Sequence, residues 1–175
     1  MRSATVARHR EALLEAWFEH LLAGYPEQTA RFLRSRKDPF HNPVGTGLRT
    51  ELGAVIDGLA AGVEPVELHE PLDRMIRIRA VQDMSPSAAV GFVLELRRVV
   101  RSVAGDELSS AELARLDRWV EGLLLVAFDV FARCREQIFD IRVLEIRNRS
   151  LKVVERLNAW RERRGEAVVE PATAP

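Results

Sequence analysis

The chain has 175 residues, of which 47% are hydrophobic, with 26 Lys+Arg balanced by 26 Asp+Glu and a single Cys. This length suits one domain with an extension, and one cysteine excludes an internal disulfide and a multi-cysteine zinc site. Zero net charge argues against a non-specific nucleic-acid binder. No apolar run is long enough to span a membrane and no signal-peptide pattern is present, so we expect a cytoplasmic protein.

The spacing of apolar residues predicts helices almost throughout, and no strand pattern competes with it. In the first third of the chain we expect three helices, over residues 4–23, 26–36 and 43–61. Asn42 and Pro43 suit the N-cap and first position of the third helix, which Gly62 ends. That helix also contains three glycines, Gly45, Gly47 and Gly53. Because each costs about 1 kcal/mol relative to Ala, they predict a close approach of another helix on that face.

Three more helices are expected, over residues 66–82, 86–104 and 110–164. Ser85 suits an N-cap, and Ser109 with Glu112 forms a capping-box pattern before the last helix. If unbroken, that helix would be about 80 Å long, against a radius of gyration of about 16 Å for a compact domain of this size. We therefore expect it to break near Asn148–Ser150 or to project from the domain. This divides the chain into a globular domain over 1–149, a linker-type helix over 150–164 and a flexible tail over 165–175.

An unusual polar set lies on the helix over 66–82 and directly after it. Its members are Arg74, Arg77, Arg79, Gln82 and Asp83. Some of these side chains must approach the apolar stripe of the same helix, and a buried arginine requires a partner. An ion-paired strut between helices would satisfy them. The alternative is a pocket for a small anionic ligand.

The stretch from Arg142 to Arg164 contains eight basic and three acidic residues, so it is either a solvated helix face or a contact surface for nucleic acid or acidic protein. Apolar positions continue along it, with one polar exception: Leu144, Asn148, Leu151, Val154 and Leu157. An asparagine at a core-like position fixes register in parallel coiled coils. These five residues therefore predict the interface of a homodimer.

We expect no reactive chemistry. The four histidines show no metal-ligand spacing, and no nucleophile motif or phosphate-binding loop occurs. Cys134 lies on the apolar stripe of the last helix, which predicts a buried and inert thiol. No catalytic residue, metal ion or cofactor is predicted.

Three segments resemble a known family: residues 31–45 (RFLRSRKDPFHNPVG), 74–92 (RMIRIRAVQDMSPSAAVGF) and 128–139 (FDVFARCREQIF). They are similar to the N-terminal domain of RsbR/RsbRD-type co-antagonists of the bacterial stressosome, over about residues 10–150. The resemblance implies a globin-like domain without haem that dimerises and acts as a sensor. His69 is poorly placed to reach an iron, and the helix over 43–61 has no His or Gln as a distal partner, so haem is not expected. The family continues into a phospho-switch domain that these 175 residues do not contain, which implies a stand-alone relative.

We therefore predict an all-α, globin-like bundle of about six helices with a long C-terminal helix. Its expected function is non-enzymatic regulation through dimerisation and through binding of an unidentified protein partner or small ligand. Two alternatives remain open at this point. One is a small haem- or redox-associated protein that accompanies an electron-transfer complex, and the other is a nucleic-acid-associated regulator that uses the basic helix over 142–164.

Overall fold

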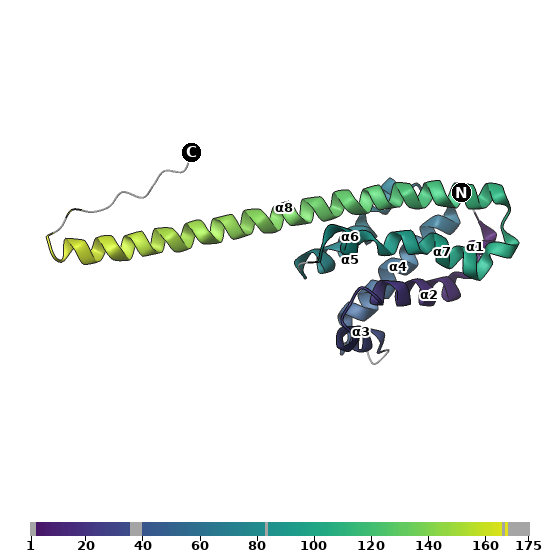
Figure 1. The fold of residues 1–175 in the computed structure, drawn as a ribbon, viewed down its shortest axis with the longest axis horizontal. Coiled ribbons are helices and arrows are strands. Elements are labelled where there is room, and N and C mark those ends of the chain that lie inside the picture. Colours follow the sequence, from purple (N-terminus) through teal and green to yellow (C-terminus); the bar gives the residue numbers. More distant parts are fainter. Residues whose placement is uncertain (1–2, 36–39, 83, 166, 168–175) are drawn as a thin grey trace. The chain divides into compact units, whose positions relative to one another are not determined.

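The computed structural model describes residues 3–35, 40–82, 84–165 and 167 (Figure 1). These residues form helices and connecting turns, and the described part contains no strand. The predicted all-α, globin-like bundle with a long C-terminal helix is confirmed. Contacts divide the chain into two units, Met1–Cys134 and Arg135–Pro175, and each is described by itself.

The first unit contains α1 (Ala4–Arg8), α2 (Arg10–Leu22), α3 (Glu27–Arg34), α4 (Pro43–Ala61), η1 (Pro65–Leu68), α5 (His69–Val81), α6 (Pro86–Val90), α7 (Phe92–Ala104), η2 (Gly105–Glu107) and the start of α8 (Ser110–Glu162). Helix α2 packs against both α4 and α7, and α4 also packs against α1 and α5. The core is mostly apolar, and its fully buried side chains include Trp17, Phe18, Leu52, Leu72, Met75, Leu96 and Leu123. The Trp17 indole also donates a hydrogen bond of 2.7 Å to the Phe92 carbonyl, which ties α2 to α7.

The predicted helix signals of α4 are confirmed in atomic detail. The Asn42 side chain accepts a hydrogen bond of 2.9 Å from the Gly45 amide, and Pro43 occupies the first turn. Gly62 ends the helix with φ +78°, a left-handed conformation in which a side chain would be strained. A Cβ at Gly45 would lie 2.4 Å from the Leu33 carbonyl oxygen, so the expected close approach occurs there, whereas one at Gly47 would meet nothing within 4 Å.

The later helix starts are also confirmed. The Ser85 hydroxyl accepts from the Ala88 amide at 3.3 Å. At the start of α8, the Ser109 hydroxyl accepts from the Glu112 amide, and the Glu112 carboxylate accepts from the Ser109 amide at 2.9 Å. This reciprocal capping box satisfies two amides that the helix itself leaves without partners.

Two predicted helices are divided in the structure. The helix expected over 4–23 breaks at His9, whose backbone lies at φ −93° and ψ 12° and whose ring pairs with Glu107 at 2.9 Å. The helix expected over 86–104 breaks at Gly91, which bonds to Ser87 at 2.8 Å. Both breaks are local, because the i→i−4 backbone hydrogen bonds from His9 to Thr5 and from Gly91 to Ser87 are retained. The apolar spacing continues across each break, so periodicity alone does not reveal it.

The second unit contains the remainder of α8, from Arg135 to Glu162, and its exposed turn residues. The helix runs unbroken through 148–150, so of the two outcomes expected for it, a break there or a helix that projects from the domain, the break does not occur. No Pro or Gly interrupts this part, and the ion pair between Arg149 and Glu145, at 2.6 Å, supports the helix just before that point. The division of the chain at residue 149 stays a prediction. Most of the predicted tail, residues 166 and 168–175, lies outside the described residues.

Candidate functional site

The structure separates the arginines that the sequence groups on α5. Arg79 is buried, with 1% of its surface exposed, whereas Arg74 and Arg77 are exposed. Arg74 pairs with Glu51 at 2.9 Å and contacts Glu70, and Arg77 pairs with Asp73 at 2.6 Å. These two side chains therefore form ion pairs within α5 and between α5 and α4.

The other members of the predicted set do not join these pairs. Gln82 is exposed at the end of α5, and Asp83 lies outside the described residues. The described members thus take three different environments and do not converge on one site. Ligand binding by the set stays a prediction.

Arg79 lies where two helices end. Its Nε donates to the Ala89 carbonyl at 3.0 Å, its Nη2 to Ala88 at 2.8 Å, and its Nη1 reaches the Leu21 carbonyl at 3.5 Å. Helix ends carry carbonyl groups without intrahelical partners and a partial negative charge, which a cation stabilises. The guanidinium therefore holds the ends of α2 and α6 together.

Aromatic rings complete the surroundings of Arg79. Its guanidinium carbon lies 4.9 Å from the Tyr25 ring centroid and 5.3 Å from that of Phe92. Burial lowers the pKa of Arg79 below its ordinary value and raises the pKa of Tyr25 above its ordinary value. Within the described residues no carboxylate pairs with Arg79, so carbonyl dipoles and ring faces compensate its charge.

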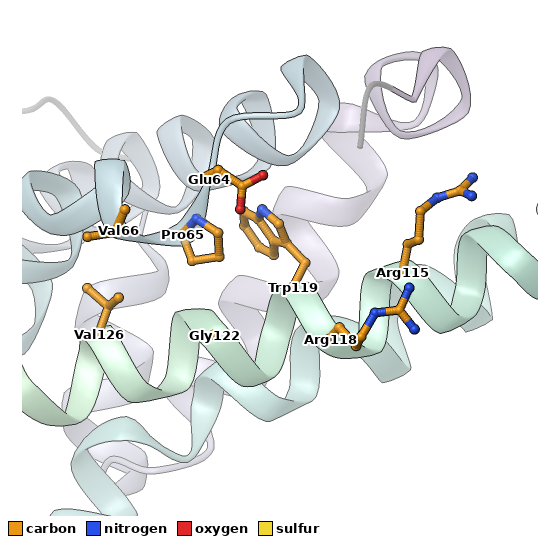
Figure 2. A pocket seen from close by; sticks show the side chains of 8 residues that line it. All are labelled: Glu64, Pro65, Val66, Arg115, Arg118, Trp119, Gly122 and Val126. Carbon is orange, nitrogen blue, oxygen red and sulfur yellow. The ribbon is translucent and has the colours of Figure 1, made fainter.

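A surface groove lies between η1 and α8 in the first unit (Figure 2). It has a volume of about 440 Å³ and is lined by Glu64, Pro65, Val66, Arg115, Arg118, Trp119, Gly122 and Val126. Figure 2 shows Arg115 and Arg118 at one end and Val66 with Val126 at the other. The sequence analysis did not single out these residues. The sequence does contain one signal for this site. Arg115 and Arg118 are three residues apart, about one helical turn, and Trp119 follows Arg118 directly.

The side chains of the second unit are almost all exposed, including many large apolar ones. Of the five predicted interface residues, Leu144, Asn148, Leu151 and Leu157 are exposed and Val154 is half-buried. Ile141, Leu144, Asn148 and Leu151 follow steps of three, four and three residues, and we call them the seam. A second apolar set has strict seven-residue spacing, and we call it the heptad stripe: Phe139, Ile146, Val153 and Trp160.

A shallow recess lies on the seam. Its lining includes Ile141, Leu144, Glu145 and Asn148, at positions i, i+3, i+4 and i+7 of the helix. Four residues in this pattern form the hole that receives one side chain of a facing helix in a coiled coil. The seam thus places two leucines, an isoleucine and an asparagine at the spacing of a helix-pairing face.

Sites for metal or redox chemistry have little support in the described residues. They contain no group of three or more His, Cys, Asp or Glu that could hold a metal ion. Cys134 is buried, and burial raises the pKa of its thiol, which favours the less reactive protonated form. His69 is exposed, and its Nε2 contacts a guanidinium nitrogen of Arg133. No described helix is both long and apolar enough to cross a membrane.

Comparison with known proteins assigns the family. The family model described as RsbT co-antagonist protein rsbRD N-terminal domain matches residues 11–145. An uncharacterized protein of Archaeoglobus fulgidus is 27% identical over 141 residues, which covers 78% of this chain and 83% of that protein. No solved structure matches. The family match spans the whole first unit from α2 onward and the first residues of the second, so this chain belongs to the family of RsbT co-antagonist rsbRD N-terminal domains.

Proposed function

We propose that this protein is a cytoplasmic, non-enzymatic regulatory domain that forms a homodimer through the helix of its second unit and acts by contact with a protein partner. The family is one of regulatory domains associated with the stressosome. The single observation that carries the dimer is the seam, because it joins exposed apolar residues to a recess of coiled-coil shape.

The composition of the seam supports pairing of identical helices. Leu144 is 56% exposed and Leu151 is 38% exposed, so both side chains would lose contact with water when a second helix covers them. Asn148 between them is a polar residue of the kind that fixes register in parallel coiled coils, where two asparagines at the same level bond to each other. Parallel alignment brings the same residues of both copies together, which is one of the arrangements that a two-fold axis allows.

The heptad stripe offers an internal comparison. Ile146 is 65% exposed and Val153 is 62% exposed, so they resemble the seam leucines in exposure and apolar character. They lie on a different face of the same helix, because Ile146 follows Leu144 by two residues and hence by more than half a turn. Two aspartates placed on either face therefore add the same charge to the helix, and the resulting variants differ in the face that carries it.

Light scattering coupled to size-exclusion chromatography tests the proposal at about 50 µM protein. The chain has a mass of 19.8 kDa, and we expect twice that mass for the wild type and the monomer mass for L144D/L151D. The control I146D/V153D should stay dimeric. A monomeric wild type, or a dimer that L144D/L151D leaves intact, would contradict the proposal. Circular dichroism should show an unchanged helix content for both variants.

Regulation requires a second condition. A partner can shift this domain between two states only if it binds them with different affinity. The dimer and the monomer are two such states if the partner recognises one of them better. Partner affinity measured for the wild type and for L144D/L151D would reveal this difference.

A further inference from the structure

The groove between η1 and α8 has rigid walls. The Trp119 indole, only 6% exposed, donates a hydrogen bond of 2.8 Å to the Val63 carbonyl and so fixes the chain before η1 against α8. A Cβ at position 122 would lie 3.2 Å from Pro65 Cγ, so Gly122 lets the two walls approach closely. Both contacts hold η1 close to α8.

The two ends of the groove differ in chemistry (Figure 2). Arg115 and Arg118 are exposed at one end, and neither forms an ion pair with an acidic side chain in the part of the chain that the structure describes. At the other end Val66 is 69% exposed. Glu64 is the one acidic residue of the lining. Its carboxylate accepts a hydrogen bond from the backbone amide of Glu67 in the N-terminal cap of η1. The charge of the two arginines is therefore available to a ligand.

We propose that this groove binds an acidic and apolar peptide segment of a partner protein. Guanidinium groups bind carboxylates through paired, charge-assisted hydrogen bonds, and arginine and tryptophan supply much of the binding energy of protein interfaces. The groove is open along the surface, which suits a chain segment that enters and leaves it. It thus presents carboxylate recognition at one end and an apolar contact at the other.

The helix geometry sets the spacing of the peptide. Arg118 and Val126 are eight residues apart on α8, which corresponds to about 12 Å at 1.5 Å per residue. An extended peptide covers this distance in about four residues. We therefore expect a carboxylate pair followed, three or four residues later, by a branched apolar side chain.

This inference rests on the proposed function, because it names the chemistry of the partner. The experiment selects a phage-displayed library of random dodecapeptides on the full chain and measures the affinity of the recovered peptides by fluorescence anisotropy. We expect the recovered peptides to carry the acidic and apolar spacing given above. We expect R115E/R118E to bind them at least about tenfold more weakly, since two attractive charges become repulsive.

Three further variants sharpen the test. R115K/R118K keeps both charges and should retain part of the affinity, because lysine lacks the paired geometry of arginine. V66D places a charge at the apolar end and should weaken binding. R147E/R163E makes the same change in net charge at exposed positions elsewhere on the chain, so it should leave binding unchanged.

Several results would overturn the inference: no recovered peptide, recovered peptides without acidic residues, or equal affinity for the wild type and R115E/R118E. Light scattering on the same samples keeps the two proposals apart. A monomeric wild type that still binds acidic peptides refutes the dimer alone. A dimer that binds none of them refutes the groove alone.

Discussion

The guanidinium carbon of Arg79 lies 4.9 Å from the centroid of the Tyr25 ring, and both side chains are buried. The same guanidinium donates to carbonyls at the ends of α2 and α6. Burial of a charged guanidinium costs free energy. Its removal would also be costly, because the buried carbonyl groups that accept its hydrogen bonds would lose their partners. Arg79 is therefore a structural residue that joins three helices.

Replacement of Arg79 tests this role. We expect Arg79→Met to lower the free energy of unfolding by about 2–4 kcal/mol, because the carbonyls of Ala88 and Ala89 lose their donors in a buried place. Arg77→Met is the matched control, since it removes an exposed ion pair with Asp73 and should change stability by less than about 0.5 kcal/mol. Urea denaturation measures both. Equal effects of the two variants would show that Arg79 has no special part in stability.

Tyr25 gives a prediction about pH. Its hydroxyl is buried near the Arg79 guanidinium and has no hydrogen-bond partner of good geometry among the described residues, and burial raises the pKa of the phenol above 10.0. A group whose pKa is raised by folding contributes stability that is complete below its unfolded value and is lost as the pH rises through the folded value. We expect the wild type to lose stability as the pH rises above about 10, and Tyr25→Phe to lose less. Tyr25 is the single tyrosine of the chain, so no other phenol contributes to the difference.

At neutral pH the same substitution should be neutral or should stabilise the protein by about 1 kcal/mol, because it removes a buried hydroxyl that lacks a partner. Thermal unfolding of both proteins at pH 7 and at alkaline pH provides the measurement. A large loss of stability at pH 7 would mean that the hydroxyl has a partner that matters.

Two glycines of α4 should respond in opposite directions to alanine. Gly45→Ala places a Cβ 2.4 Å from a backbone oxygen and close to the Asn42 cap, so we expect a loss of more than about 2 kcal/mol. Gly47→Ala meets no atom within 4 Å and should stabilise the helix by up to about 1 kcal/mol. Denaturant titrations decide the matter. A loss of stability in Gly47→Ala would show that helix propensity does not govern that position.

The capping box predicts a response to acid. Hydrogen bonds from Ser109 lower the pKa of Glu112, so its contribution to stability is present above pH 4.5 and is lost as the pH falls through the lowered value. Glu112→Gln should therefore flatten the acid limb of the stability curve relative to the wild type. Ser109→Ala should cost about 1 kcal/mol at neutral pH through the loss of the cap. Chemical denaturation at a series of pH values tests both, and parallel acid limbs in the wild type and Glu112→Gln would contradict the first.

Local chemistry explains which parts of the fold the sequence predicts. Asn42, Ser85 and Ser109 are recognisable as caps because each acts on an amide three residues away. The break at His9 depends on Glu107, which lies 98 residues later in the chain, and no local pattern contains that contact. The apolar pattern is compatible with either a break near 148–150 or one continuous α8, and the structure has the continuous helix.

The sites were harder to predict than the helices. Arg74, Arg77 and Arg79 are close in sequence, but a helix distributes neighbours around its circumference, so they meet different surroundings. The groove requires Pro65 and Gly122 to approach across 57 positions of sequence, and only the tertiary packing brings them together. Leu144, Asn148 and Leu151 of the seam are among the five residues that the sequence predicts as an interface, because an apolar stripe is a property of a single helix; their pairing stays a prediction.

The spacing of the seam has a geometric consequence. Steps of three and four residues average 3.5 per turn, whereas a straight α-helix has 3.6, so the line of side chains drifts by about 20° in each seven residues. Two helices that keep Ile141, Leu144, Asn148 and Leu151 in contact must wind around each other with a left-handed twist. A rotation applied at one end of such a winding pair would reach the other end as a change in twist.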